Sequence, residues 1–153
     1  MKQAKYMYRS EGQLRLYEFT SEGPRGSVKK IVEYTETNTV NVYNLAFGDY
    51  DQVTRSFNDL SITDNGDSSK VLATVASTIF AFVEKYPDAW ITATGSTVVR
   101  TRLYRMGITN NLAEISEEFV IFGYNSQGQW EEFVVDKDYQ AFLLTKKNNW
   151  LAI

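Results

Sequence analysis

The chain contains neither cysteine nor histidine. The absence of cysteine excludes disulfides, thiolate zinc sites and cysteine nucleophiles. The absence of histidine removes the commonest general base near neutral pH, the Ser-His-Asp relay and every imidazole metal ligand.

Long apolar runs are also absent, and no segment approaches the roughly 20 residues that a membrane-spanning helix needs. The segment from Met1 to Gly12 is polar and lacks the apolar region of a signal peptide. We therefore expect a cytoplasmic protein.

The 153 residues match the size of one domain, and a hydrophobic content of 43% is enough to fill its core. The charged fraction of 23% is ordinary for a globular protein. We expect a single domain over residues 1–153, with residues 1–12 as a flexible or edge segment.

The net charge of −3 hides an alternation of sign along the chain. Residues 1–35 and 70–105 are basic, whereas residues 36–69 and 106–135 are acidic. Such blocks either meet in space and neutralise one another or form separate faces, one of which attracts an anionic partner. The first arrangement follows the general rule that charges mostly serve solvation.

Alternating apolar residues predict a sheet built largely from hairpins. Strands are expected at residues 14–20, 28–34, 39–47, 90–94, 119–124 and 130–135, with a loop at 21–26 and one short strand turn at 60–63. The element at residues 139–146 fits either a helix or a strand.

One long core helix is expected from Ser68 to Tyr86, because apolar residues recur there at intervals of three and four. Asp67 or Ser68 would cap its N-terminus, and Pro87 would end it. The crossover through this helix would make the strands on either side of it parallel if they are neighbours.

A short helix is expected from Thr97 to Met106, with Gly107 as the left-handed residue that ends it. Helical spacing places Val99, Leu103 and Met106 on the face that packs against the rest of the domain.

Asn111 followed by Glu114 indicates the start of a further helix, with Leu112 and Ile115 facing inward. Together these elements predict an α+β fold in one domain. It would consist of a largely antiparallel sheet of five to seven strands, one long core helix and one or two short helices.

The most informative segment runs from Ala93 to Gly107, where a strand exit, a Gly-Ser-Thr turn, a helix start and three arginines follow one another. Backbone N–H groups at a helix start lack partners and carry partial positive charge, so hydroxyls and arginines there can hold a phosphate or a carboxylate. The candidate anion-binding residues are Ser96, Thr97, Arg100, Arg102, Arg105 and, from an earlier hairpin, Arg25.

A structural interpretation of this segment stays open beside the functional one. Ser96 or Thr97 would simply cap the helix, while the arginines pair with Asp88, Glu114 or Glu117. The segment is not a Walker loop, because no second glycine precedes Lys-Ser/Thr, and it lacks two glycines of a dinucleotide fingerprint. No cofactor is predicted.

Four aspartates, Asp49, Asp51, Asp64 and Asp67, carry the oxygen ligands that Mg²⁺ and Ca²⁺ prefer. Their spacing matches no standard calcium loop, and a helix cap and a turn account for most of them. Two-metal phosphodiester cleavage with these carboxylates and Lys70 is therefore the less favoured interpretation, and no metal ligand is assigned.

A basic hairpin tip is expected around Arg25, with Lys29 and Lys30 on the strand that follows. Basic strands flanked by aromatic residues can follow a nucleic-acid backbone while the rings stack on bases. The alternative is that the tyrosines pack with their hydroxyls at the surface.

Five motifs in the chain resemble a known family of bacterial proteins of about this length, described only as a domain of unknown function. The motifs are SEGPRG at 21–26, YNLAFGD at 43–49, NGD at 65–67, VLATV at 71–75 and GSTVVRTRLYRMGI at 95–108. The resemblance covers about residues 14–147. It implies a bacterial, soluble, intracellular context and one domain, and it implies no activity.

From these patterns we predict a non-enzymatic module that binds a phosphate-bearing partner, nucleic acid included. The alternative is a protein–protein interaction module, such as a homodimer, in which basic and acidic blocks match across an interface. A metal-assisted phosphoesterase using Asp49, Asp51 and Asp67 is a third hypothesis. Arginines exposed on one face without carboxylates would favour the binder, and paired arginines would favour the interaction module.

Overall fold

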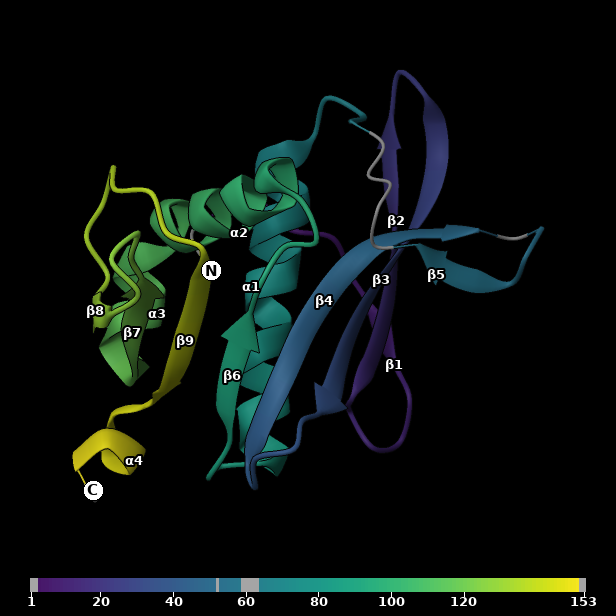
Figure 1. Cartoon of the computed structure of the whole chain (residues 1–153). Coiled ribbons are helices and arrows are strands. Elements are labelled where there is room, and N and C mark those ends of the chain that lie inside the picture. Colours follow the sequence, from purple (N-terminus) through teal and green to yellow (C-terminus); the bar gives the residue numbers. More distant parts are fainter. Residues whose placement is uncertain (1–2, 52, 59–63, 152–153) are drawn as a thin grey trace.

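The strands of the described residues form one open sheet (Figure 1). The computed structural model describes residues 3–51, 53–58 and 64–151. In chain order the strands are β1 (Arg9–Ser10), β2 (Leu16–Gly23), β3 (Gly26–Glu36), β4 (Val42–Asp51), β5 (Ser56–Asn58), β6 (Trp90–Ala93), β7 (Phe119–Tyr124), β8 (Trp130–Glu132) and β9 (Ala141–Lys146). Their order across the sheet is β1-β2-β3-β4-β6-β9-β7-β8, and β5 pairs with the second half of β4.

The helices of the described residues are α1 (Ser68–Lys85), α2 (Val98–Asn110), α3 (Leu112–Glu118) and α4 (Lys147–Leu151). Figure 1 shows α2 running across α1 on one side of the sheet. The predicted α+β fold with a largely antiparallel sheet and one long helix is confirmed.

Strands β4 and β6 are parallel, as the crossover through α1 predicts, and every other described pair is antiparallel. The sheet has more strands than the five to seven expected, because β1 and β5 span only two and three residues. Such short strands leave no alternation for a sequence pattern to detect. Strand β1 pairs with β2, so part of the N-terminal segment forms an edge of the sheet.

Helix α1 buries every residue from Val71 to Ile79 against the sheet and α2. Val71, Leu72, Val75, Ile79 and Phe82 are each at most 6% exposed. They meet the face of β2, β3 and β4 on which every second residue is apolar, and the ring of Phe82 stacks on that of Tyr34. Helical and strand periodicities thus combine to form one core.

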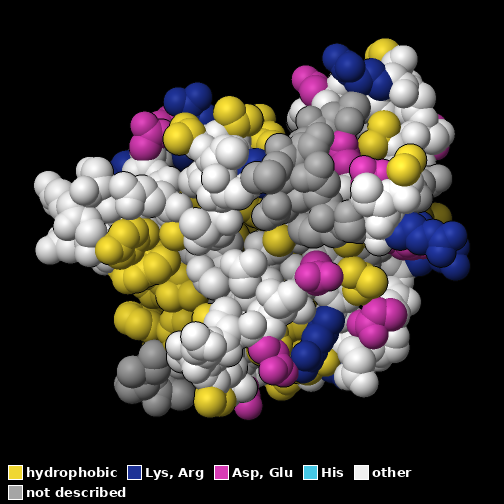
Figure 2. All heavy atoms as spheres, turned by 45° about the vertical axis from the view of Figure 1, so that its right-hand side comes forward, with side chains coloured by type: hydrophobic (Ala, Val, Ile, Leu, Met, Phe, Trp, Pro, Cys, Tyr) yellow, Lys and Arg dark blue, Asp and Glu magenta, His cyan; other side chains and the backbone are white. Residues whose placement is uncertain are grey.

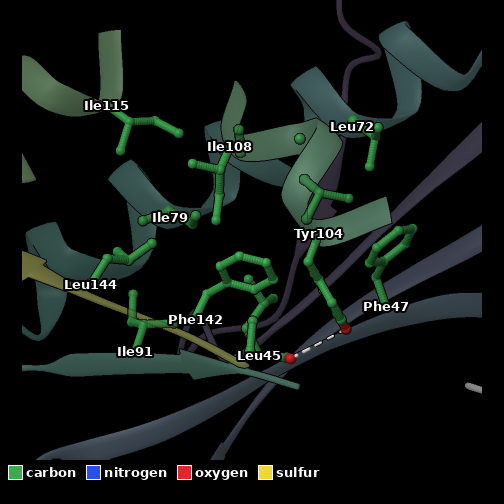
Figure 3. A pocket seen from close by; sticks show the side chains of 14 residues that line it. Leu45, Phe47, Leu72, Ile79, Ile91, Tyr104, Ile108, Ile115, Phe142 and Leu144 are labelled. Carbon is green, nitrogen blue, oxygen red and sulfur yellow. Dashed lines mark hydrogen bonds between the residues drawn. The ribbon is translucent and has the colours of Figure 1, made fainter. Parts of the chain in front are cut away.

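Figure 3 shows the centre of this core, where side chains from the helices and from the sheet surround a cavity of about 40 Å³. Its lining is apolar, apart from the Tyr104 hydroxyl, which donates a hydrogen bond to the Leu45 carbonyl oxygen at 3.3 Å. Ligand pockets usually measure roughly 300–1,000 Å³, so this cavity is a packing defect and not a binding site.

The expected loop at residues 21–26 is wrong, because β2 continues to Gly23 and β3 begins at Gly26. Pro24 and Arg25 alone form the turn, and Gly26 adopts a φ of +89° that favours glycine. Asn65 fastens this tip by accepting the Arg25 N–H and donating to the Gly26 carbonyl.

The predicted end of the second helix is also wrong, because α2 continues through Gly107 to Asn110. Gly107 is buried where α2 packs on α1, and a Cβ there would lie 3.5 Å from the Leu72 side chain, an ordinary van der Waals distance. A glycine inside a helical pattern therefore does not always end the helix.

The buried face of α2 differs from the predicted stripe. Val99 and Met106 are 65% and 42% exposed, and only Leu103 of that stripe packs against the core. The buried residues are instead Arg100, Tyr104, Gly107 and Ile108. The two sets have the same helical spacing and differ by a rotation of about 100° around the helix.

The side-chain caps predicted for α1 and α3 are not made. Asp67 precedes α1 but accepts hydrogen bonds from the Tyr6 and Ser21 hydroxyls. Asn111 precedes α3, and its amide donates back to the Gly107 carbonyl. Asp67 thus links the start of α1 to the N-terminal segment and β2, and Asn111 links the start of α3 to the last turn of α2.

The remaining element boundaries agree with their predictions only in part. The strand at 119–124 is confirmed at both ends, and the unassigned element at 139–146 is mainly β9. The return strand expected at 130–135 covers only β8. The strand turn expected at 60–63 lies outside the described residues.

Val75→Asp should destabilise the protein by about 3 kcal/mol or more, because it places an unpaired carboxylate in the core. Val75 is 5% exposed and lines the central cavity. Urea denaturation measures the effect, and Val40→Asp, at a position that is 86% exposed, is the control. Equal unfolding midpoints for the two variants would contradict this account of the core.

Candidate functional site: the start of helix α2

A strand-to-helix junction lies at the position that the sequence predicts. β6 ends at Ala93 and α2 begins at Val98, so four residues connect them. The Thr97 hydroxyl caps the helix by accepting the Arg100 backbone N–H at 3.2 Å. This part of the structural interpretation is therefore confirmed for Thr97.

Gly95 is required by a close approach within the junction. A Cβ at this position would lie 2.3 Å from the backbone nitrogen of Thr101 and 2.8 Å from the Arg100 carbonyl carbon. No side chain fits there without moving the first turn of the helix. Gly95 thus sets where α2 begins relative to β6.

A groove of about 540 Å³, the α2 groove, runs beside this junction. One wall consists of residues 95–98 and the side chains of Thr101, Arg102 and Arg105. Ser126, Asp138, Tyr139 and Gln140 form the other wall. Its volume suits a small ligand, and many of its side chains carry hydrogen-bonding groups.

Arg100 does not line the groove but faces the sheet. Its side chain is buried, with the residue 3% exposed, and its guanidinium carbon lies 5.3 Å from the centre of the Phe47 ring. The Nη1 and Nη2 nitrogens are buried and have no hydrogen-bond partner. Among the buried side-chain atoms without a partner in the described part of the chain, these are the only ones on a charged group.

The three remaining predicted arginines have different surroundings. Arg102 is exposed and makes no ion pair with any described residue. Arg105 pairs with Asp138 across the α2 groove. Arg25 lies at the β2–β3 tip, where its Nε donates to the Asp64 carbonyl oxygen, and it does not line the groove.

The acids that the structural interpretation assigns to these arginines are not their partners. No ion pair joins Asp88, Glu114 or Glu117 to Arg100, Arg102 or Arg105 within residues 3–51, 53–58 and 64–151. By the geometric criterion given above, Arg102 favours the binder and Arg105 does not. Arg100, buried without a carboxylate, follows neither expected pattern.

Elsewhere the charge blocks meet and neutralise one another. Lys30, which is fully buried, pairs with Asp49 on the neighbouring strand, and Arg15 pairs with Glu36. In the view of Figure 2, basic and acidic side chains are interspersed and form no continuous basic face. Arg100 differs from the other described basic residues because its charged nitrogens are buried without a partner.

The aspartates of the metal hypothesis are occupied by separate contacts. Asp49 pairs with Lys30, the Asp51 carboxylate accepts the Val53 N–H, and Asp67 binds two hydroxyls. No group of three acidic residues that could hold a metal ion occurs among the residues that the structure describes.

A hydrogen-bonded network around Glu131 supports the far wall of the α2 groove. Its carboxylate accepts hydrogen bonds from Asn125, Lys137 and Tyr139, with distances of 2.7–2.9 Å. These donors lower the pKa of Glu131 to about 2, with the Asn125 contribution the largest. The network thus holds the segment that carries Asp138 against the sheet.

Sequence reasoning missed the residues that complete the site from elsewhere in the chain. Phe47 makes a cation–π contact with the Arg100 guanidinium. Ser126, Asp138 and Gln140 form the far wall of the groove. The YNLAFGD motif contains Phe47, but nothing in its pattern indicates which arginine would lie over the ring.

Comparison with known proteins gives one match. The model of DUF6934, a family of unknown function, matches residues 2–147 of the chain. No curated protein and no solved structure shows significant similarity. No described helix is long and apolar enough to cross a membrane.

Gly95→Ala should destabilise the protein by about 1 kcal/mol or more, because its Cβ must displace the backbone at the start of α2. Gly12→Ala is the matched control, since no atom lies within 4 Å of a Cβ there. Guanidinium denaturation compares the two. If both glycines tolerate alanine equally, the close approach at Gly95 does not position α2.

Protonation of Glu131 should destabilise the protein in acid. Its folded-state pKa of about 2 lies below the ordinary value of 4.5, so this stabilisation is present above pH 4.5 and is lost as the pH falls toward 2. Urea midpoints measured from about pH 6 down to about pH 2.5 should fall less steeply for Glu131→Gln than for the wild type. Glu132→Gln, at an exposed neighbouring position, should retain the wild-type slope, and an unchanged slope for Glu131→Gln would contradict the network.

Proposed function

Because the chain belongs to DUF6934, a family of unknown function, we propose its function from the geometry at the start of α2: it is a module that binds a phosphate-bearing ligand. The observation that carries this proposal is the buried Arg100 guanidinium, whose two Nη nitrogens lack partners. Ser96, Thr97, Arg102 and Arg105 contribute from the α2 groove.

The chain itself does not compensate the Arg100 charge. A buried ion without a partner costs several kcal/mol, and a desolvated cation–π contact such as that with Phe47 offsets about 2 kcal/mol or more of this cost. An anion bound by both Nη nitrogens would remove this deficit through charge-assisted hydrogen bonds.

The dipole of α2 adds to the same local charge. The N-terminus of a helix carries partial positive charge, which acidic residues in the first turn commonly offset. The first turn of α2 has no acidic residue and contains Arg100. Arg100 thus adds a full positive charge near the unpaired amides of this terminus.

A small ligand fits these observations better than nucleic acid. The net charge is −3, and basic and acidic side chains alternate over the face in Figure 2. A polyanion would be attracted by a continuous basic surface, whereas one compact positive site attracts one compact anion. Arg25, at the hairpin tip, would contribute only to the nucleic-acid alternative.

A protein–protein interaction module is the second candidate. Val98 and Val99 on α2 are 70% and 65% exposed, which favours an interface that includes the start of this helix. The binder is preferred because exposed valines are common on protein surfaces, whereas a buried arginine without a partner is not.

Arg100→Met should weaken the binding of inorganic phosphate roughly ten- to hundredfold, because it removes charge-assisted contacts. The protein should be as stable as the wild type or more stable, since an uncompensated buried charge is replaced by an apolar chain of similar length. Amide NMR titration measures binding, and urea denaturation measures stability.

The control is Arg9→Met, which changes the net charge equally at a position distant in sequence and exposed to solvent. It should change neither measurement. A wild type that binds no phosphate, or an Arg100→Met protein that loses stability while retaining phosphate binding, would show that Arg100 is structural.

A further inference from the structure

Helices α1, α2 and α3 pack on one face of the sheet and leave the other face without a helical layer. Strand residues alternate between the two faces, and every second residue of β4, β6, β7 and β9 belongs to the core on the helical side. The residues between them form the opposite face, here named the open face. It consists of the even-numbered residues within 42–46, 90–92 and 120–124 and the odd-numbered residues within 141–145.

The open face is uncharged and carries an unusual share of the aromatic residues. None of the residues that define it is Lys, Arg, Asp or Glu. All three tryptophans of the chain lie on it or against it. Trp90 belongs to it, the ring of Trp130 on β8 lies 5.0 Å from that of Tyr124, and the ring of Trp150 on α4 lies 5.0 Å from that of Phe122.

Figure 2 shows hydrophobic side chains gathered on the left, over the β7–β9 end of the sheet, in a patch that no charged side chain interrupts. Trp130 and Trp150 are 46% and 45% exposed. Tryptophan is enriched at the centres of protein interfaces, and contiguous apolar patches on a surface commonly mark such interfaces.

The charge of the open face favours a second copy of the chain as the partner. Around a twofold axis the same surface forms both sides of the interface, so a charged surface would meet its own charge. The open face has no charge that would be repelled in this way. A nucleic-acid backbone or an anionic lipid surface is attracted by lysines and arginines, which the open face lacks.

The area of the open face is sufficient for a dimer. The five neighbouring strands β4, β6, β9, β7 and β8, about 4.8 Å apart and up to roughly 20 Å long, cover about 500 Å². Two such faces would bury about 1,000 Å², which is the lower bound for a specific interface. Trp150 and Leu151 on α4, which are 45% and 79% exposed, extend the surface toward the usual size.

We propose that the chain forms a homodimer in which two open faces pack on each other. The two sheets lie face to face, as in a β-sandwich, and the tryptophans of both copies are buried between them. This interface is separate from the proposed phosphate site, because α2 lies on the helical side of the sheet. It also differs from an interface through the exposed valines of α2.

Sedimentation equilibrium of the full chain between about 1 and 300 µM tests the proposal, because interfaces of this size have dissociation constants in the micromolar range or below. The wild type should reach the mass of a dimer within this range. Trp130→Glu should raise the dissociation constant at least about tenfold, since it removes an aromatic anchor and places two like charges in the interface. Val98→Glu adds the same charge on α2, at a position that is 70% exposed, and should dissociate as the wild type does.

Tryptophan fluorescence of the wild type gives a second measurement that needs no variant. Emission should shift to shorter wavelengths as the dimer forms, because the indole rings leave water. A wild type that stays monomeric up to about 300 µM, or a dimer that forms without this shift, overturns the proposal.

The variants distinguish the open face from other surfaces. A dimer weakened by Val98→Glu and not by Trp130→Glu would place the interface on α2 and overturn the proposal. Trp150→Glu takes the place of Trp130→Glu if the latter has a lower urea midpoint than the wild type, and unchanged dimerisation would again overturn it. A monomeric wild type whose tryptophan emission shifts on phosphatidylcholine vesicles would assign the open face to lipid instead of a second copy.

Discussion

The attachment of Tyr104 to strand β4 determines the geometry of the whole candidate site. Its ring packs edge-on against Phe47, with centroids 5.5 Å apart, and its hydroxyl donates to the Leu45 carbonyl oxygen. Arg100 lies one turn earlier on the same face, so the attachment brings its guanidinium onto the same strand. Gly107, one turn later, fits against α1. One helix face thereby contacts the sheet, the core helix and the charged site together.

The start of α2 differs from the rest of the described molecule because its buried positive charge has no partner within the chain. The buried Lys30 has a carboxylate partner, and Glu131 has three hydrogen-bond donors, so charges in those regions are compensated within the chain. At the start of α2, the helix dipole, Arg100 and Arg102 have the same sign and no acidic residue accompanies them in the first turn. The proposed site would therefore select its ligand by contact, because a protein of net negative charge exerts little long-range attraction on polyanions.

Much of the fold was predictable because it follows from periodicity. The long apolar pattern after Ser68 identified α1, the run from Phe119 identified β7, and the crossover predicted the parallel pair β4–β6. These patterns reflect burial of apolar surface, which is the dominant favourable term in folding.

The site was predictable only in part. Gly95 and Thr97 predict the start of α2, which the structure has at Val98. An apolar pattern cannot predict that Arg100 is buried, because charged side chains are rarely inside. The choice between the Val99 face and the Arg100 face depended on how closely α2 approaches α1. That approach is a tertiary property, and the pairing of Arg105 with Asp138 across 33 positions is another.

The position of β9 in the sheet has a consequence for the order of assembly. Strand β9 is the last in the described chain, yet it lies between β6 and β7 and forms the only described strand pairings that connect them. Before β9 is synthesised, the edge of β7 that will pair with β9 has no partner. The edge of β6 that will pair with β9 has none either. Both edges stay open to other chains until residues 141–146 have left the ribosome, so the interval before release of the C-terminal region is the time of greatest exposure to aggregation.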